Sequence, residues 1–450
     1  MRRCGDNVRR LASLLNRGRL GDLVRSDTGR AAGMAIAVMV GNVLGLVFTV
    51  VFARKLGQTG YGSLGALIST YIILMVPGAA VQTTVAREVS AAYAADDPQA
   101  GAGVRRWLET LLVALVVIAA ISVLGRHVLA AIIGVKDVPW AAAGTLTSGC
   151  LWLMLSIERG ALQGFHRYRI VGVSWVMDAT GRLIFALALV GAGGGVTGAF
   201  LGTPLSLAAV SLVLLIPLAR LLPHSDRGAH PLRDLFVRAG APVAALALVA
   251  WMQDGNVIIV KHIATGRQAG SWAAAAVAAK AIMWIAVGLS LYIVPEVARR
   301  ARLRERPAGV LTSALGLIAV VGIPMVLVYA VAGREILRIA FGHKFVSAAG
   351  ALPWLGLAMC CLACTYLAVQ YHLALHRWRF IGVLVVAAVA QPAVLVTIGA
   401  DLTPIALGLL GVNAALAVTM VSLSYRARPG PVADQVADEP ELEPVLTQTE

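Results

Sequence analysis

Four charged side chains lie inside long apolar stretches of the sequence. Asp178 and Arg182 are four residues apart in one stretch, and Asp254 and Lys280 lie in two others. A charge at the centre of a bilayer costs roughly 2.5–3.5 kcal/mol or more, so such residues are functional candidates by default. The cations suit an anionic ligand, and the carboxylates suit a coupling ion such as H⁺ or Na⁺.

Each of these residues also has a purely structural interpretation. Asp178 precedes Arg182 by one helical turn, the favourable order for a self-neutralised pair; alternatively, protonation of Asp178 frees Arg182 for substrate. Lys280 either neutralises Asp254 or binds a pyrophosphate in a cavity. Asp254 either couples transport to an ion or packs helices together through its polarity.

Residues 53–87 supply two further cations. An apolar run ends at Arg54, a glycine-rich turn follows, and a second apolar run stops at Arg87. This pattern predicts a hairpin of two spanning helices. Arg54 is either an interfacial anchor or a cavity cation, and Arg87 either marks the inner edge of a cavity or extends its charged end to the interface.

The composition predicts the type of structure that holds these charged side chains in place. Apolar residues make up 59% of the chain, charged residues only 14%, and the mean hydropathy is +0.81, well outside the range of soluble domains. A helix needs roughly 20 apolar residues to cross a bilayer. In lipid, the backbone N–H and C=O groups of each segment must form hydrogen bonds with one another, which favours helices. We therefore predict an all-α polytopic membrane protein with twelve spans, at about 31–53, 61–83, 107–125, 140–157, 170–192, 196–219, 239–260, 270–294, 309–331, 348–370, 380–399 and 403–424.

The distribution of the net charge of +15 indicates the orientation of the chain in the membrane rather than binding to nucleic acid. With the N-terminus inside, the inner segments hold 27 of the 38 lysines and arginines and the outer loops hold 9. This is the positive-inside pattern. We expect both termini in the cytoplasm and no nucleic acid as a partner. Residues 158–169, ERGALQGFHRYR, are expected to form one of the basic inner loops.

An internal repeat divides the chain into two halves. Residues 166–173 match residues 376–383 at an offset of 210 residues. Gly134 matches Gly342 at an offset of 208 residues, and the hairpin turn recurs at an offset of 207 residues. Six spans per repeat is an even number, so the repeats are parallel, with a pseudo-two-fold axis along the membrane normal and a site between the halves. The predicted parts are a basic cytoplasmic arm (1–30), an N-terminal six-helix lobe (31–219), a cytoplasmic linker (220–238), a C-terminal six-helix lobe (239–425) and an acidic disordered cytoplasmic tail (426–450).

Several motifs in order carry a family resemblance. They are Arg54-x-Leu56-Gly57-x-x-x-Tyr61-Gly62, Gly78, Arg87, Gln163-Gly164-x-x-Arg167, Asp254, Gly266, Gly270-Ser271-Trp272, Pro295 and Gly342-x-x-Phe345-x-x-Ala348. Over residues 31–425 the chain resembles the Wzx-type polysaccharide flippases. These belong to the superfamily that includes the lipid II flippases and the MATE multidrug exporters.

The resemblance implies a transporter of the bacterial cytoplasmic membrane that serves cell-envelope polysaccharide biosynthesis. A lipid-linked oligosaccharide on a polyprenyl diphosphate would pass from the inner to the outer leaflet by alternating access. Membrane lipids and a glycan polymerase or glycosyltransferase are the expected partners. The expected cavity cations are Lys280, Arg182, Arg54 and Arg87, and the ion-coupling candidates are Asp254 and Asp178.

Other functions remain open at this stage. A MATE-like ion-coupled exporter of small cations, a lipid II flippase, and a membrane scaffold or glycan enzyme are the alternatives. Carboxylates would dominate the cavity of a cation exporter, whereas here two acids balance two bases. No nucleotide-binding loop, metal motif or catalytic triad stands out, so no cofactor, metal or enzyme activity is expected; Cys361 and Cys364 are expected to pack as small apolar residues.

Overall fold

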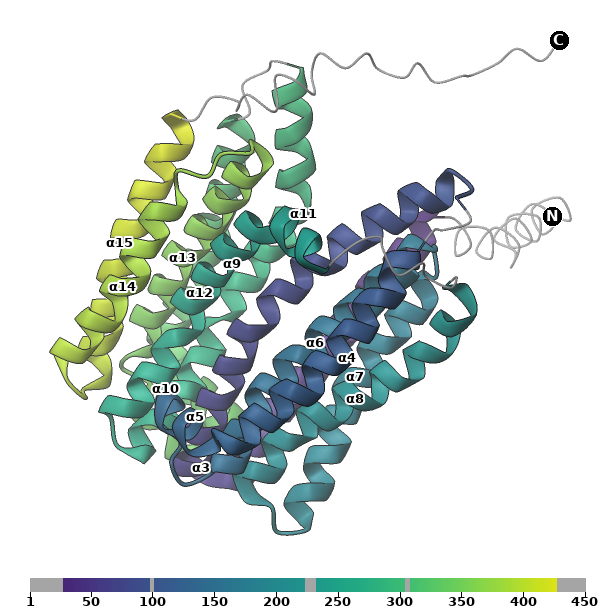
Figure 1. Ribbon diagram of the computed structural model, residues 1–450. Helices are drawn as coiled ribbons and strands as arrows, with labels where there is room; N and C mark the ends of the chain where they lie inside the picture. The colour runs from purple at the N-terminus through teal and green to yellow at the C-terminus, as the bar shows by residue number, and fades with distance from the viewer. Residues whose placement is uncertain (1–26, 98–100, 223–231, 304–307, 427–450) are drawn as a thin grey trace, which may run out of the picture. The chain divides into compact units, whose positions relative to one another are not determined.

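The computed structural model describes residues 27–97, 101–222, 232–303 and 308–426. Within these ranges the chain forms α-helices and one short 3₁₀ helix, with no strand, which confirms the predicted all-α class (Figure 1). The predicted N-terminal arm and C-terminal tail lie outside the described residues, apart from residues 27–30, which belong to α3, and Arg426, which ends α15. About half of the predicted linker also lies outside them.

The helices follow one another with short connections. In chain order they are α3 (Asp27–Ala94), α4 (Ala102–Leu124), α5 (Arg126–Ile133), α6 (Pro139–Gly164), α7 (Tyr168–Gly191), α8 (Gly195–Leu221), α9 (Leu232–Ile263), α10 (Gly266–Ala279), α11 (Ala281–Arg302), α12 (Ala308–Ala340), η1 (His343–Ala348), α13 (Leu352–Ala374), α14 (Ile381–Ile398) and α15 (Leu402–Arg426).

Helix α3 contains the predicted hairpin. Eleven segments of the described chain are long and apolar enough to span a membrane, and the longest, Ile36–Ala94, has 59 residues. A straight helix of that length would measure about 88 Å. Instead Gly57 takes φ 68° and ψ −177°, a non-helical conformation that breaks the helix.

Contacts of one α6 residue show that the chain turns back at this point. Gln163 accepts a hydrogen bond from Gln82 at 3.2 Å and donates one to the Met34 sulfur at 3.5 Å. Met34 precedes Gly57 and Gln82 follows it, so both sides of the break return to the same helix. Helix α3 therefore supplies two crossings, and the predicted twelve spans are confirmed.

The described chain divides into two compact units. The first unit comprises the described parts of residues 1–52, 77–129 and 138–239, and the second comprises those of 53–76, 130–137 and 240–450. Thus the turn of the α3 hairpin and the end of α5 pack with the C-terminal half of the chain. The predicted lobe boundaries, which were drawn in sequence order, remain predictions.

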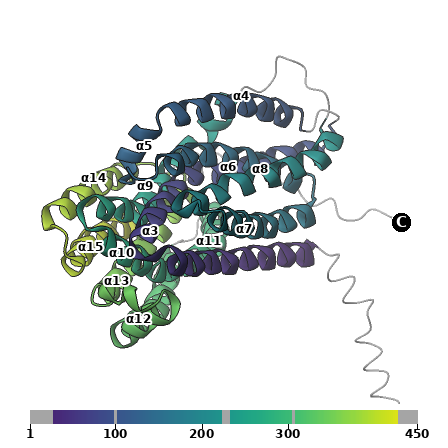
Figure 2. The same ribbon diagram turned by 90° about the horizontal axis from the view of Figure 1, so that it is seen from below.

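In the first unit, small residues let helices approach closely. Helices α4, α6, α7 and α8 run side by side (Figures 1 and 2). The second half of α3 lies against the small residues of α6: a Cβ on Gly160 would lie 2.6 Å from the Gln82 carbonyl oxygen, and one on Gly164 would lie 2.6 Å from Val89 Cβ. Such close backbone contact is how spanning helices associate in lipid.

The second unit holds the α3 turn in the same way. A Cβ on Gly270 of α10 would lie 2.0 Å from the Gln58 carbonyl oxygen, so only glycine fits there. Gln58 Nε2 donates to Ser271 Oγ at 2.9 Å and to the Lys344 carbonyl at 2.6 Å. Tyr61 is buried, with its ring centroid 5.7 Å from that of Phe345. The turn is therefore part of the second unit's core.

The two copies of the sequence repeat share unusual backbone conformations. His166 and His376, which occupy equivalent repeat positions, have φ 56° and 53°, and they are two of the three non-glycine residues with positive φ in the described chain. Gly134 and Gly342 also match, with φ 81° and 109°. Left-handed conformations are rare outside glycine, so this agreement indicates that the repeat is structural.

Candidate functional site

The second unit contains a fully buried carboxylate paired with a lysine. Asp254 lies in α9 with no exposed surface, and Lys280 Nζ donates to its Oδ1. Gln253 Nε2 donates to the second oxygen, Oδ2, at 3.0 Å. Both oxygens of Asp254 are therefore occupied, as a charge in an apolar interior requires. The predicted partnership of Lys280 with Asp254 is present.

A short polar network fixes the α9 side of this pair. Asn256 is fully buried; its Nδ2 donates to the Gln253 carbonyl at 2.7 Å, and its Oδ1 accepts from Trp272 Nε1 at 2.9 Å. Trp272 belongs to α10 and is also fully buried. The network thus connects α9 to α10, and it restricts the position of the Asp254 carboxylate relative to the helix that leads to Lys280.

Lys280 lies at a break between two helices, which the sequence did not predict. Helix α10 ends at Ala279 and α11 begins at Ala281, within one apolar segment of 36 residues, Gly266–Ala301. Tyr329 of α12 donates its hydroxyl to the Ala278 carbonyl at 2.8 Å. A tertiary partner therefore satisfies a carbonyl beside the break. The interruption is slight, because Lys280 itself keeps helical dihedral angles (φ −63°, ψ −16°) and its N–H donates to the Ala276 carbonyl at 3.0 Å.

The first unit contains the second predicted pair on a single helix. Arg182 Nη2 lies 3.2 Å from Asp178 Oδ2, one turn apart in α7. Ser206 of α8 donates to the Asp178 main-chain oxygen at 2.8 Å and lies 3.3 Å from its Oδ1. The Asp178 side chain is 4% exposed and that of Arg182 is 27% exposed. The predicted self-neutralised pair is present here too.

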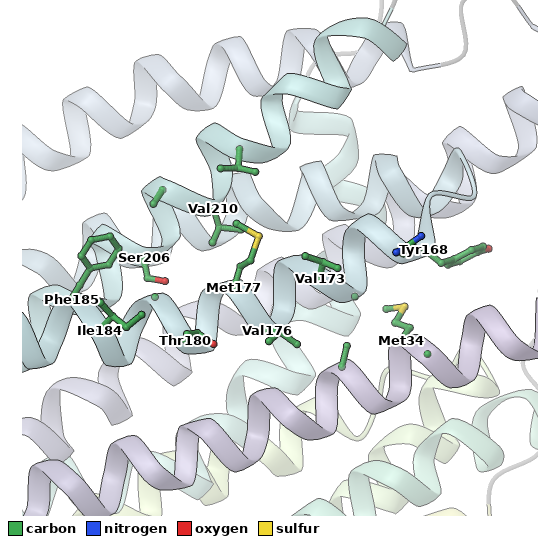
Figure 3. A pocket seen from close by; sticks show the side chains of 17 residues that line it. Met34, Tyr168, Val173, Val176, Met177, Thr180, Ile184, Phe185, Ser206 and Val210 are labelled. Carbon is green, nitrogen blue, oxygen red and sulfur yellow. The ribbon is translucent and has the colours of Figure 1, made fainter. Parts of the chain in front are cut away.

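A groove runs along this part of the first unit, between α3, α7 and α8. Its volume is about 1140 Å³, and apolar side chains such as Met34, Val176 and Ile184 form most of its lining. Figure 3 shows Tyr168 and Met34 at one end, and Ile184 and Phe185 at the other.

Glu158 and Arg159 form a buried charged site that the sequence did not reveal. The prediction that residues 158–169 form a loop is wrong for residues 158–164 and 168–169, because α6 continues to Gly164 and α7 begins at Tyr168. Both side chains have no exposed surface. Ser211 donates to Glu158 Oε1 at 2.5 Å, and Glu158 Oε2 has no hydrogen-bond partner among the described residues.

Arg159 turns toward aromatic rings rather than toward water. Its Nε donates to Ser174 Oγ at 2.9 Å, and its guanidinium carbon lies 4.3 Å from the Trp175 ring centroid and 5.4 Å from that of Trp152. Such cation–π contacts stabilise a desolvated cation. The small residues one turn apart at Ser156 and Gly160 were the sequence signal that the helix continues.

The two remaining predicted cations have different surroundings. Arg54 donates its Nε to the Ala340 carbonyl at 3.2 Å and its Nη2 to the Ile339 carbonyl, at the C-terminal end of α12. A cation at this end of a helix satisfies its last carbonyls and its dipole. Arg87 is exposed on α3 and has no hydrogen bond or ion pair with another described residue. Neither lies in a buried pair.

Comparison with known proteins shows the fold. No family model matches the chain, and no curated protein matches it. Among solved structures, an inward-facing multidrug resistance MATE family transporter of the MOP superfamily is similar, with a TM-score of 0.74, 12% identity, and coverage of 88% of this chain and 97% of that one.

Lipid II flippase MurJ in an inward closed conformation is similar too, with a TM-score of 0.68, 12% identity, and coverage of 90% of this chain and 89% of that one. The chain has the fold of the MOP-superfamily transporters. A MOP-superfamily transporter from Pyrococcus furiosus shares this fold at a TM-score of 0.56 and 13% identity, covering 90% of this chain and 96% of that one. The chain is thus a multi-pass membrane protein with a MOP fold.

Proposed function

We propose that the protein is a flippase that moves a polyprenyl-diphosphate-linked oligosaccharide from the inner to the outer leaflet for cell-surface polysaccharide synthesis. The observation that carries this proposal is the polarity of the two ion pairs. The Lys280 side chain is 13% exposed while that of Asp254 is 0% exposed, and Arg182 is 27% exposed while Asp178 is 4% exposed. In both pairs the cation is the accessible partner, which suits an anionic diphosphate.

The same polarity argues against export of small cations. A cationic substrate needs a carboxylate that it can reach, whereas both oxygens of Asp254 and of Asp178 already have protein partners. Displacing these partners would leave a lysine or an arginine without its counter-ion, at a cost of several kcal/mol when buried. The pairs suit any lipid-linked diphosphate, so transport assays must identify the sugar.

The Asp254–Lys280 pair also offers a means of ion coupling. A proton on Asp254 would weaken its attraction for Lys280, and the substrate diphosphate would then replace Asp254 as the counter-ion of the ammonium. Release of the diphosphate would restore the pair. Asp178 and Arg182 could work in the same manner in the first unit. Alternating access of two six-helix lobes would then carry the head group across.

A flipping assay with three Lys280 variants tests the proposal. Purified protein in liposomes with a fluorescent polyprenyl-diphosphate oligosaccharide is assayed by the fraction of sugar accessible to an added glycosidase. Lys280→Ala should slow flipping by about tenfold or more, since one charge-assisted contact is worth over 1.4 kcal/mol. Lys280→Arg, which keeps the charge but changes its geometry, should retain part of the rate.

A double variant separates charge from stability. In Asp254→Asn/Lys280→Met the pair is replaced by neutral groups, so no buried charge is left alone. If the cation binds substrate, this protein folds normally and still fails to flip. Lys136→Ala, which removes an exposed lysine of the same unit, is the matched control and should flip at the normal rate. Full flipping by the double variant, or export of a cationic dye by a wild-type protein that flips no lipid, would contradict the proposal.

A further inference from the structure

The groove of the first unit is open along an apolar face. Its wall includes Val173, Ile184 and Phe185 of α7, which are 52%, 58% and 36% exposed. Glycines deepen it: Gly33 of α3 lines the groove, and a Cβ added there would meet nothing within 4 Å. In a multi-pass membrane protein, an apolar recess of this kind accepts a hydrocarbon chain.

The groove is longer than an ordinary lipid chain requires. Its lining extends along α7 from Arg169 to Phe185, and sixteen steps of about 1.5 Å make about 24 Å. The hydrocarbon core is about 30 Å thick, so an acyl chain confined to one leaflet reaches about 15 Å. A groove that is longer than one leaflet is deep suits a chain of similar length, as a polyprenyl chain is.

The charged side chain that lines the groove, Arg169, lies at one end of its α7 wall. Tyr168, which Figure 3 labels at this end, begins α7 and is followed by Arg169, which also lines the groove. Arg169 is exposed and forms no ion pair with any described residue. A cation at one end of a long apolar recess is complementary to a lipid with one anionic head group and one long tail.

We propose that this groove binds the isoprenoid chain of the lipid-linked substrate, with Arg169 holding the diphosphate. The inference rests on the proposed function and deepens it, because it assigns a binding site to the carrier lipid rather than to the sugar. The site would load the substrate from the membrane. The Asp178–Arg182 pair lies further along the same helix, close to groove residues Thr180 and Ser206.

Photocrosslinking in liposomes tests the groove without requiring transport. Benzoylphenylalanine replaces Val176 in the groove or, as the control, Val116, a 66% exposed residue of α4 in the same unit that does not line it. The probe is radiolabelled polyprenyl diphosphate without sugar. Position 176 should be labelled and position 116 only weakly. Excess unlabelled polyprenyl diphosphate should compete, whereas phosphatidylglycerol and the much shorter farnesyl diphosphate should compete poorly.

Arg169→Gln should weaken labelling at position 176 by about tenfold, the usual effect of losing one charge-assisted contact. Arg169→Lys should retain much of it. Equal labelling at positions 176 and 116, or equal competition by phosphatidylglycerol, would overturn the proposal and indicate a surface that ordinary lipid covers. Specific labelling of a protein that flips no lipid would leave the groove proposal intact and reject the proposed function instead.

Discussion

The two ion pairs differ in how they are built, although both lie within apolar helices. Asp178 and Arg182 are one turn apart on α7, so a single helix is enough to bring them together. Asp254 and Lys280 are 26 residues apart and join α9 to the break between α10 and α11. The first pair is local, and the second depends on tertiary packing.

This difference has a mechanical consequence. A pair within one turn does not depend on how its helix moves relative to other helices, so only protonation of Asp178 or a competing anion would separate it. An ion pair between two helices stabilises the protein only while those helices keep the relative position that brings the two side chains together. Loss of a charge from the Asp254–Lys280 pair should therefore affect both stability and conformational change. Loss of a charge from the Asp178–Arg182 pair should affect mainly function.

The largest expected effect is that of Asp254→Ala. It leaves Lys280, whose side chain is only 13% exposed, without its counter-ion, and breaking a buried pair typically costs about 3–5 kcal/mol. Asp178→Ala should cost less, because the Arg182 side chain is 27% exposed and can turn away. Denaturant unfolding of both variants in nanodiscs measures the difference. Equal losses would show that the long-range pair is no more important than the local one.

The next effect concerns the glycine that lets the α3 turn reach α10. Gly270→Ala places a methyl group 2.0 Å from the Gln58 carbonyl oxygen, and overpacking of this kind costs about 1–3 kcal/mol. Gly288→Ala in α11 meets nothing within 4 Å and should stabilise the helix by about 0.5–1 kcal/mol. Thermal unfolding should shift in opposite directions for the two variants. A neutral Gly270→Ala would mean that the turn does not depend on this contact.

A loss of similar size should follow Ser211→Ala in the first unit. It removes the hydrogen-bond partner of Glu158 Oε1, and a buried polar atom left without a partner costs about 1–3 kcal/mol. A double-mutant cycle with Glu158→Gln, measured by denaturant unfolding, isolates the contact. A coupling energy near zero would show that Glu158 is held by its other surroundings rather than by Ser211.

Arg182→Ala should cost less stability than Asp254→Ala. It leaves Oδ2 of the 4% exposed Asp178 side chain without its hydrogen-bond partner, at a cost of about 1–3 kcal/mol. Flipping should also slow if Arg182 contacts the diphosphate. Paired measurements of unfolding and of flipping separate the two effects. A large loss of stability with normal flipping would make Arg182 a structural residue and weaken the assignment of function to the first unit.

Some features of the site were predictable because they depend on local chemistry. Asp178 and Arg182 are one helical turn apart, so their pairing follows from helix geometry alone. The hairpin at Gly57 follows from two apolar runs that are each long enough to cross a bilayer. The matched positive φ values of His166 and His376 show that the sequence repeat carried reliable structural information.

Other features of the site could not be predicted from sequence patterns. Glu158 and Arg159 look like the start of a basic loop, yet Ser211, Ser174 and two tryptophans bury them inside the first unit. Charge normally indicates an interface with water, and only partners from other helices reverse that expectation. The break at Lys280 likewise has no proline or glycine beside it, and Tyr329 of another helix satisfies a carbonyl next to it.

The sequence by itself determined the class of the protein, the number of its crossings and four of its intramembrane charges, Asp178, Arg182, Asp254 and Lys280. Bilayer thickness and the cost of burying charge act on each segment separately, so these properties can be derived one segment at a time. Only the tertiary structure decided that residues 53–76 pack with the C-terminal half, that Lys280 meets Asp254 at a helix break, and that α3, α7 and α8 enclose an apolar groove. Each of these three features depends on how side chains from helices far apart in the chain fit together. Hydrophobic periodicity describes one segment at a time, so it does not predict which segments pack together.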